Sequence, residues 1–254
     1  MEEEQLVKSR LKDLAQRAYK QNIYTYSNFM TPAELGWFRD LEKDISYIDY
    51  SLSGGYDLAE RQMICFGSED MFGYEGQFPI SVIRVEPLID KFSDQLNHRD
   101  FLGAVMNLGI ERNVVGDILV RDNKIGYIFC MDSIAEYILD NLLKIKHTSV
   151  KCSLLSKEDS FTELAPKIKE VSVIVASARF DAIVAALTKA SRSDALSMFK
   201  SGKITLNGVL CERNSQSLKE EDIFSIRGYG KYRYLGSGKE TRKGKIYVNI
   251  GQYV

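Results

Sequence analysis

The segment "RFDAIVAALTKASRSDALSMFKSGKITLNG", residues 179–208, constrains the fold of this chain more than any other segment. Its apolar residues recur at helical spacing and predict a short helix that begins near Phe180-Asp181. Ser191 is a favourable N-cap for a second helix, which Gly202 would end. Asn207-Gly208 is typical of a tight hairpin turn. The segment therefore predicts two short helices that lead into a small antiparallel sheet.

The net charge of −1 conceals a division of charge along the chain. Residues 166–254 hold 16 Lys and Arg against 8 Asp and Glu, a balance of +8, whereas the first 165 residues hold 18 against 27, a balance of −9. A basic C-terminal third predicts a polyanionic partner. The basic residues are not arranged on one long amphipathic helix, which favours nucleic acid over a membrane surface.

Arg192 is the central candidate for contact with that partner. It falls in the first turn of the second predicted helix, beside backbone N–H groups that have no partner within the helix, and such a position suits a phosphate. Arg179, Lys200 and Lys203 flank it. The other candidate RNA contacts are Ser191, Ser193, Asn207, Arg227, Lys231 and Arg233. The alternative is a solvated basic face, which the net charge of the segment and the clustering around one helix start make less favourable.

The rest of the chain predicts an α+β protein with two further regions. Residues 1–61 have mainly helical periodicity. Residues 62–160 alternate as β-α-β-β-α-β, the order of ferredoxin-like domains and RNA-recognition motifs. The aromatic RNA-binding signature of such motifs is missing, and Tyr127 and Phe129 are interpreted as core residues. The charged segment 157–170 is predicted to connect the central region to a domain at 166–254.

The tripeptide His98-Arg99-Asp100 occurs in the catalytic loop of protein kinases, where it would indicate a phosphotransferase. That loop needs an Asn five residues after the Asp, and Val105 stands there. The Gly-rich loop, the strand Lys and the Asp-Phe-Gly motif are also missing. The tripeptide is therefore predicted to start a helix. Arg99 and Arg112 form a second candidate contact surface.

Several other classes are excluded by composition. No run approaches the ~18 apolar residues of a membrane span. The first twenty residues are charged and helical in pattern, which is not typical of a signal peptide. The four cysteines, Cys65, Cys130, Cys152 and Cys211, lack close spacing, so free buried thiols in a reducing cytoplasm are predicted, without a metal site or cofactor.

Residues 179–208 resemble the S-four domain, an RNA-binding module named after a ribosomal protein of the small subunit. The matching elements, in order, are Arg179-Phe180-Asp181, Ser191-Arg192, Gly202-Lys203-Ile204 and Leu206-Asn207-Gly208, followed by Asp222. Phe180 and Ile204 replace the usual Leu and Val, which exchanges one apolar residue for another. With the central "NHRDFLGAVMNLGIERNVVGDILV", the chain resembles the YlmH-type family of bacterial RNA-binding proteins over nearly its whole length.

That resemblance implies a non-catalytic, monomeric cytoplasmic protein that binds ribosomal RNA and tRNA on the large ribosomal subunit. It also implies a role in ribosome-associated quality control, where stalled nascent chains are rescued, and a link to cell division, with no membrane and no small-molecule substrate. Two alternatives stay open. One is an RNA-modifying enzyme, because Arg179-Phe180-Asp181 is similar to the catalytic tripeptide of pseudouridine synthases. The other is a protein–protein adaptor in cell division, which leaves the basic segment unexplained.

Overall fold

The computed structural model describes residues 2–56, 59–156, 167–241 and 244–253. The chain separates into two compact units, Met1–Ala165 and Pro166–Val254. Both combine helices with antiparallel sheets, which confirms the α+β prediction. The connection predicted at 157–170 lies outside the described residues as far as residue 166, and from Ile168 onward the chain is a strand.

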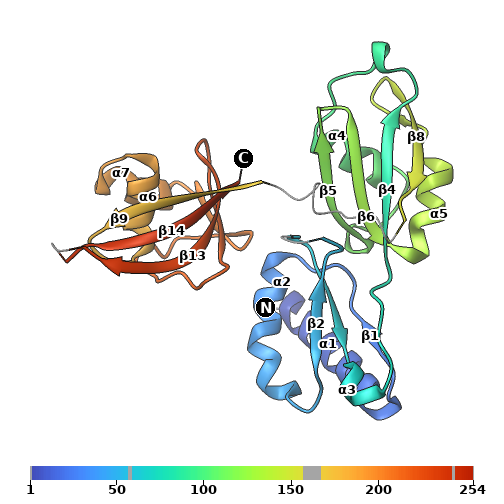
Figure 1. Ribbon diagram of the computed structural model, residues 1–254, viewed down its shortest axis with the longest axis horizontal. Coiled ribbons are helices and arrows are strands. Elements are labelled where there is room, and N and C mark those ends of the chain that lie inside the picture. The colour runs from blue at the N-terminus through green and yellow to red at the C-terminus, as the bar shows by residue number, and fades with distance from the viewer. Residues whose placement is uncertain (1, 57–58, 157–166, 242–243, 254) are drawn as a thin grey trace. The chain divides into compact units, whose positions relative to one another are not determined.

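The N-terminal part of the first unit combines helices with a small sheet (Figure 1). The helices are α1 (Glu2–Gln21) and α2 (Pro32–Leu41), followed by the 3-10 turn η1 (Glu42–Ile45). The sheet has the order β1 (Thr25–Tyr26), β3 (Met63–Phe66), β2 (Tyr50–Ser53), with the short helix α3 (Glu69–Phe72) after it. The sequence predicted mainly helices for residues 1–61 and did not predict strands β1 and β2. Strand β2 is only four residues long and mostly exposed, so its sequence has little alternation.

The predicted boundary between residues 61 and 62 falls just before β3. This strand pairs with β1 and β2, not with the central sheet. All four of its residues are buried, so one face packs on the N-terminal helices and the other on the central sheet. Strand β3 thus joins the N-terminal and central parts of the first unit.

The central part has one five-stranded sheet in the order β5-β6-β4-β8-β7. Its elements are β4 (Ile80–Pro87), η2 (Asp90–Phe92), α4 (His98–Met106), η3 (Arg112–Val114), β5 (Val115–Arg121), β6 (Ile125–Met131), α5 (Asp132–Asn141), β7 (Lys144–Ile145) and β8 (Thr148–Leu154). The chain follows the expected order β-α-β-β-α-β, with the two-residue strand β7 added before the last strand. Residues Asp122 and Asn123 have φ of 51° and 52°, the left-handed backbone of a tight hairpin turn.

The two faces of the central sheet are covered by different elements. Ile83 and Val85 of β4 belong to the same buried cluster as Phe101 of α4, on the face that carries the helices. Val82 points the other way and packs with Phe29 and Phe129. Phe129 is fully buried, so it is a core residue, as the sequence predicted. The sheet face that RNA-recognition motifs use for base stacking is here partly closed by the N-terminal part.

Asp117 on β5 holds the N-terminal and central parts together. Its carboxylate accepts hydrogen bonds from the Tyr56 hydroxyl (2.8 Å) and from the backbone N–H groups of Glu60 (2.7 Å) and Arg61 (3.3 Å). The Arg61 guanidinium donates in turn to the carbonyl oxygens of Val115 and Phe29, at 3.1 and 3.0 Å. A buried carboxylate with several donors stabilises a fold because each donor would otherwise be buried without a partner.

The second unit has a six-stranded antiparallel sheet in the order β11-β10-β12-β13-β14-β9. Its elements are β9 (Ile168–Val175), α6 (Phe180–Thr188), α7 (Arg192–Lys200), β10 (Ile204–Leu206), β11 (Val209–Leu210), β12 (Ile223–Ile226), β13 (Gly230–Glu240) and β14 (Ile246–Tyr253). Strands β9 and β14 pair along their full lengths. The sheet is larger than predicted, because this pairing joins the two ends of the unit and has no local signature.

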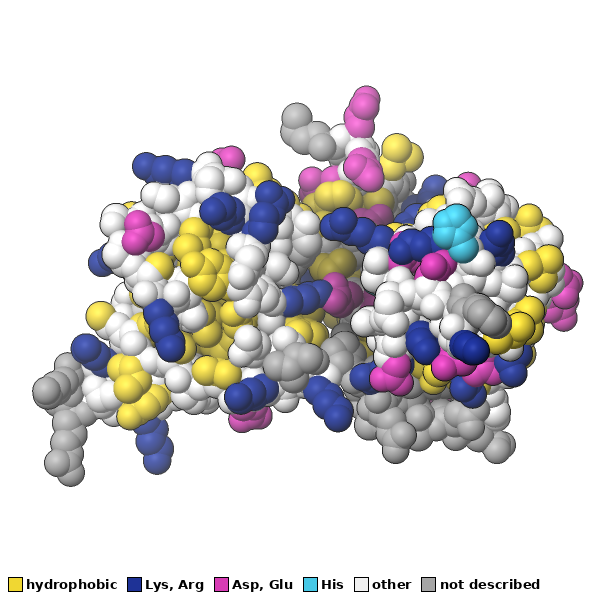
Figure 2. Space-filling view, turned by 90° about the horizontal axis from the view of Figure 1, so that it is seen from above, with side chains coloured by type: hydrophobic (Ala, Val, Ile, Leu, Met, Phe, Trp, Pro, Cys, Tyr) yellow, Lys and Arg dark blue, Asp and Glu magenta, His cyan; other side chains and the backbone are white. Residues whose placement is uncertain are grey.

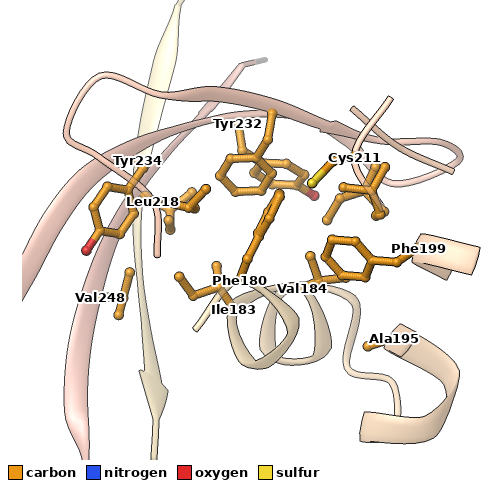
Figure 3. Packing of buried hydrophobic residues seen from close by; sticks show 14 of the residues in the cluster. Phe180, Ile183, Val184, Ala195, Phe199, Cys211, Leu218, Tyr232, Tyr234 and Val248 are labelled. Carbon is orange, nitrogen blue, oxygen red and sulfur yellow. The ribbon is translucent and has the colours of Figure 1, made fainter. Parts of the chain in front are cut away.

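Aromatic packing fixes the two helices of the second unit on the sheet (Figure 3). Phe180, the first residue of α6, makes edge-to-face contacts with Phe199 of α7 and Phe224 of β12, each with ring centroids 5.1 Å apart. Phe224 stacks on Tyr232 of β13 at 5.4 Å. All four side chains are buried. The replacement of Leu by Phe at position 180 therefore places a large ring at the centre of this core.

The cysteines are free thiols, as predicted, and three of them are buried. Burial raises the pKa of the Cys130 thiol to about 12. In the described parts of the chain, no helix is both long and apolar enough to cross a membrane. Across the same residues, no three His, Cys, Asp or Glu side chains are grouped as metal ligands would be.

Replacing Asp117 by asparagine tests how strongly this carboxylate joins the two parts of the first unit. The asparagine would have one acceptor oxygen and would place its own N–H donors near backbone donors. We expect Asp117→Asn to lower the free energy of unfolding of the first unit by about 2–4 kcal/mol. Urea denaturation followed by circular dichroism measures this. Asp140→Asn, the same exchange at a site on α5, should change it by less than about 0.5 kcal/mol; equal effects of the two variants would contradict the role of Asp117.

Candidate nucleic-acid interface

Asp181 binds two of the predicted contact residues at once. Its carboxylate is only 1% exposed and accepts two parallel hydrogen bonds from the Arg179 guanidinium, both 3.1 Å long. Arg192 approaches the same carboxylate at 3.5 Å. Arg179 directly precedes α6 and Arg192 begins α7, so one buried carboxylate holds the starts of both helices together. The sequence predicted a helix start near Phe180-Asp181, and in the structure Asp181 also binds two arginines.

The charge of Asp181 depends on these arginines. Burial alone raises the pKa of this carboxyl, but hydrogen bonds and positive charge from Arg179, with the charge of Arg192, outweigh burial and lower it below the ordinary Asp value. The two guanidinium groups keep much of their surface, with side chains 41% and 65% exposed. They can therefore bind Asp181 on one side and present donors to solvent on the other.

The start of α7 is capped as predicted. The Ser191 hydroxyl accepts a hydrogen bond from the backbone N–H of Asp194 and lies 2.8 Å from the Ser193 hydroxyl. It also donates to the Asp194 carboxylate at 2.6 Å. That carboxylate already places a negative charge at the helix end, so the positive potential here comes from Arg179 and Arg192 more than from the helix end.

A second group of cations lies where α7 leads into β10. Lys200 is in the last turn of α7, and Lys203 follows Gly202, which has the left-handed φ of 66°. The backbone N–H of Arg227, just after β12, donates to the carbonyl oxygen of Lys203 at 2.9 Å. All three cationic side chains are exposed. The structure thus brings Lys203 and Arg227 side by side although they are far apart in the sequence.

Asn207 is engaged within the fold. Its side-chain amide donates to the buried Asp222 carboxylate (2.9 Å), and its oxygen accepts from the backbone N–H of Ile223 (2.9 Å). Its φ of 49° forms the turn between β10 and β11. These bonds explain why the Asn-Gly turn and the later Asp occur together in the sequence pattern, and they leave Asn207 little capacity for RNA.

The candidate cations on β13 form a third group, and their side chains are also mostly engaged by other residues of the fold. Arg233 is 9% exposed, bonds to the Glu221 carboxylate and donates to the Tyr253 hydroxyl at 3.3 and 3.2 Å. Lys231 is half-buried, with its ammonium 5.4 Å from the centre of the Tyr253 ring. Burial, with the nearby charge of Arg233, lowers the pKa of Lys231 to about 8. Arg233 is therefore a structural residue, and Lys231 is a partly shielded cation.

Two exposed cations that the sequence prediction omitted lie near these groups. Lys189 ends α6 in a left-handed conformation, two residues before Ser191. Arg213 is next to Asn214, whose carbonyl oxygen accepts from the backbone N–H of Asp181 at 2.9 Å. In the sequence, the only indication that Lys189 and Arg213 matter was the net positive charge of residues 166–254. In Figure 2, the visible face of the second unit has Lys and Arg side chains around a hydrophobic patch, with few acidic side chains among them.

The two arginines of the second predicted contact surface, in the first unit, have different surroundings. Arg99 is exposed in the first turn of α4, whose N-cap is Asn97. Asp100 completes that cap and pairs with Lys146 at 2.8 Å, so the His-Arg-Asp tripeptide starts a helix. Arg112 is half-buried and donates to the carbonyl oxygens of Val115 and Gly116. Arg99 remains a candidate contact, whereas the Arg112 guanidinium is engaged within the fold.

Replacing Asp181 by asparagine should destabilise the second unit by about 2–4 kcal/mol, because two guanidinium groups lose their buried counter-charge. Since folding lowers the pKa of Asp181, its stabilising contribution is fully present above its unfolded pKa of about 3.9 and is lost as pH falls through the lower folded value. The unfolding free energy of Asp181→Asn should therefore depend less on pH between about 5 and 2. Exposed Asp194→Asn is the matched control, and an unchanged acid dependence in Asp181→Asn would contradict this account.

Fold and surface together define an α+β protein with an acidic first unit and a basic second unit whose exposed arginines are held by a buried carboxylate. Residues 74–159 match the family model described as "Putative RNA-binding domain in YlmH". This match covers the central sheet together with α4 and α5. The resemblance of the chain to YlmH-type proteins is confirmed.

Two individual proteins are similar to this chain. One, from Bacillus subtilis (strain 168), is described as "Ribosome-associated protein quality control protein P2" and is 28% identical over 204 residues, 80% of this chain and 77% of that protein. A match of this length extends into the second unit, because the first unit ends at Ala165. The other is a solved structure, "Cell division protein ylmH from Streptococcus pneumoniae". It is 23% identical with a TM-score of 0.50, covers 63% of this chain and 93% of that chain, and supports the fold.

Proposed function

We propose that this protein binds RNA on the ribosome without catalysing a reaction, and that its second unit is an S-four-like RNA-binding domain. The observation that carries the proposal is the pair Arg179 and Arg192, held by Asp181 and still exposed on their outer sides. A guanidinium group fixed on one side loses little further freedom when it binds a phosphate, which favours binding. Lys203 and Arg227 add further exposed positive charge after α7.

The ribosomal setting of the proposal comes from the similar proteins. The Bacillus subtilis protein carries ribosome-associated quality control in its name, and the central domain matches an RNA-binding family. We propose that the chain works as a cytoplasmic monomer on ribosomal RNA and tRNA of the large subunit, where it takes part in the rescue of stalled nascent chains. We also propose a link to cell division, the process after which the Streptococcus pneumoniae protein is named.

The proposal of a non-catalytic protein is supported by the surroundings of Asp181. In the alternative of a pseudouridine synthase, this carboxylate would have to reach a nucleotide. It is instead 1% exposed and covered by two guanidinium groups. A carboxylate held in this way has neither the access nor the free oxygen lone pairs that a nucleophile needs. The alternative of a protein–protein adaptor does not explain the excess of positive charge in residues 166–254.

Arg192→Ala tests the proposal directly. It should weaken binding to large-subunit ribosomal RNA by roughly 1–3 kcal/mol, because a charge-assisted hydrogen bond to phosphate is lost. The slope of log affinity against log salt should fall by about one. Stability should fall by less than about 1 kcal/mol, since Arg179 still pairs with Asp181. Filter binding at two salt concentrations, with thermal melting, measures these quantities.

The matched control for Arg192→Ala is Arg39→Ala, which removes an exposed arginine from α2. It should leave both RNA affinity and salt slope nearly unchanged. If Arg192→Ala binds RNA as tightly as Arg39→Ala does, the start of α7 is not the contact and the S-four proposal fails.

Lys231 provides a pH test of the β13 surface. Because its pKa is lowered to about 8, it loses its charge as pH rises through that value. If its ammonium contacts RNA, affinity should weaken several-fold between about pH 7 and pH 9, at most tenfold per pH unit for one linked proton. Lys231→Arg should remove that dependence, because Arg stays charged. A pH dependence that persists in Lys231→Arg would assign it to another group.

A further inference from the structure

The central domain has a groove on the face of its sheet that carries α4 and α5, separate from the candidate RNA contacts of the second unit. It has a volume of about 530 Å³, within the range of ordinary ligand sites. One wall is α4, and the other is formed by the end of α5 and by β7. Six of the residues that line it carry the argument: Arg99, Gly103, Asn107, Asn141, Lys144 and Lys146.

The groove is positive in a domain that is negative overall. Residues 74–159 hold 10 Lys and Arg against 13 Asp and Glu. The groove has three cations and one carboxylate, Asp100, which already binds the Lys146 ammonium (2.8 Å) and the backbone N–H of Asn97 (2.9 Å). Arg99 and Lys144 are exposed. An anion approaching this domain is therefore attracted to the groove more than to the domain as a whole.

Gly103 leaves the α4 wall of the groove without a side chain at that point. It lies in the middle of α4, where Gly weakens a helix relative to Ala. Internal packing does not require it, because an added Cβ would meet no atom within 4 Å. Gly126 differs, since a Cβ there would lie 2.3 Å from the Phe101 ring. The bare backbone at Gly103 leaves room for a bound molecule to approach α4 closely.

The two ends of the groove differ in chemistry. Arg99 and Lys146 lie at the N-terminal end of α4, where their positive charge favours a phosphate. Asn107 follows the last turn of α4 and Asn141 ends α5, so that end offers two side-chain amides, of which the Asn141 nitrogen already donates to the carbonyl oxygen of Tyr137 (2.8 Å). Arg99 and Asn107 are about 12 Å apart along the helix axis. Such a site suits a ligand with phosphates at one end and hydrogen-bonding bases at the other.

The opposite face of the central sheet is a poor alternative for the same ligand. Phe129, whose strand position would stack a base, is fully buried and packs against Tyr56, with ring centroids 4.7 Å apart. Residues 74–159, which match the RNA-binding family, include the whole groove. We propose that the groove between α4 and β7 binds a short single-stranded segment of RNA, with phosphate at Arg99 and Lys146 and base at Asn107 and Asn141. This inference rests on the proposed function that the protein binds RNA.

The test uses the full-length protein and a labelled single-stranded RNA oligonucleotide that contains 4-thiouridine. After irradiation, cross-linked peptides are identified by mass spectrometry. Cross-links to residues 98–108 or 141–146 are expected. Gly103→Gln should remove them and weaken oligonucleotide binding by about tenfold without lowering the melting temperature, since Gln fills the groove, leaves the charge unchanged and favours the helix.

Two matched controls isolate the groove. Gly36→Gln changes a glycine in α2 that also has no atom within 4 Å of an added Cβ, so it should favour its helix but keep the cross-links. Lys144→Gln should weaken binding several-fold and lower the salt slope by about one, whereas Lys43→Gln, at an exposed position in η1, should do neither.

The outcomes separate this inference from the proposed function. Cross-links confined to residues 167–253, with Gly103→Gln and Gly36→Gln binding alike, overturn the groove as an RNA site, while a loss of affinity in Arg192→Ala still supports the second unit. If no variant and no parent protein binds RNA, both proposals fail. Displacement of the groove cross-links by adenosine monophosphate as readily as by unlabelled oligonucleotide would overturn the RNA strand in favour of a single nucleotide.

Discussion

The second unit depends on the ion pairs of the Asp181 carboxylate. A buried carboxylate is costly unless charge and hydrogen bonds compensate it, and here Arg179 and Arg192 do so. Because Arg179 directly precedes α6 and Arg192 begins α7, the requirement of one buried charge sets the relation of the two helix starts. Phe180, next to Asp181, fills the core between α7 and the sheet. The same few residues therefore stabilise the unit and position its exposed cations.

The first unit uses a buried carboxylate for a different purpose. Asp117 binds backbone and side-chain donors of the segment before β3, so it joins the N-terminal part to the central sheet. That junction closes the sheet face around Phe129 and leaves the helix side with the groove beside α4. A β-α-β-β-α-β domain that keeps its open surface on the helix side presents a different binding surface from an RNA-recognition motif.

Local features were predictable, and features that join distant segments were not. The helix start at His98-Arg99-Asp100, the cap at Ser191 and the turn at Asn207-Gly208 depend on hydrogen bonds or backbone conformations within a few residues. The pairing of β9 with β14, and the N-terminal sheet, have no such local signature. Among the candidate contacts, Arg192 and Lys203 are exposed, whereas Arg112, Asn207 and Arg233 are engaged inside the fold.

The sequence by itself determined the α+β class, the basic character of residues 166–254, the free cysteines and the likeness to YlmH-type proteins, because composition, periodicity and motifs are properties of the chain itself. Only the tertiary structure decided which cations face solvent and which hold the fold together. Arg192 and Arg233 have the same side chain and both lie in the basic unit, yet one is 65% exposed as a side chain and the other 11%. The difference arises because Glu221 and Tyr253, distant in the chain, close around Arg233, while Asp181 binds Arg192 from one side alone.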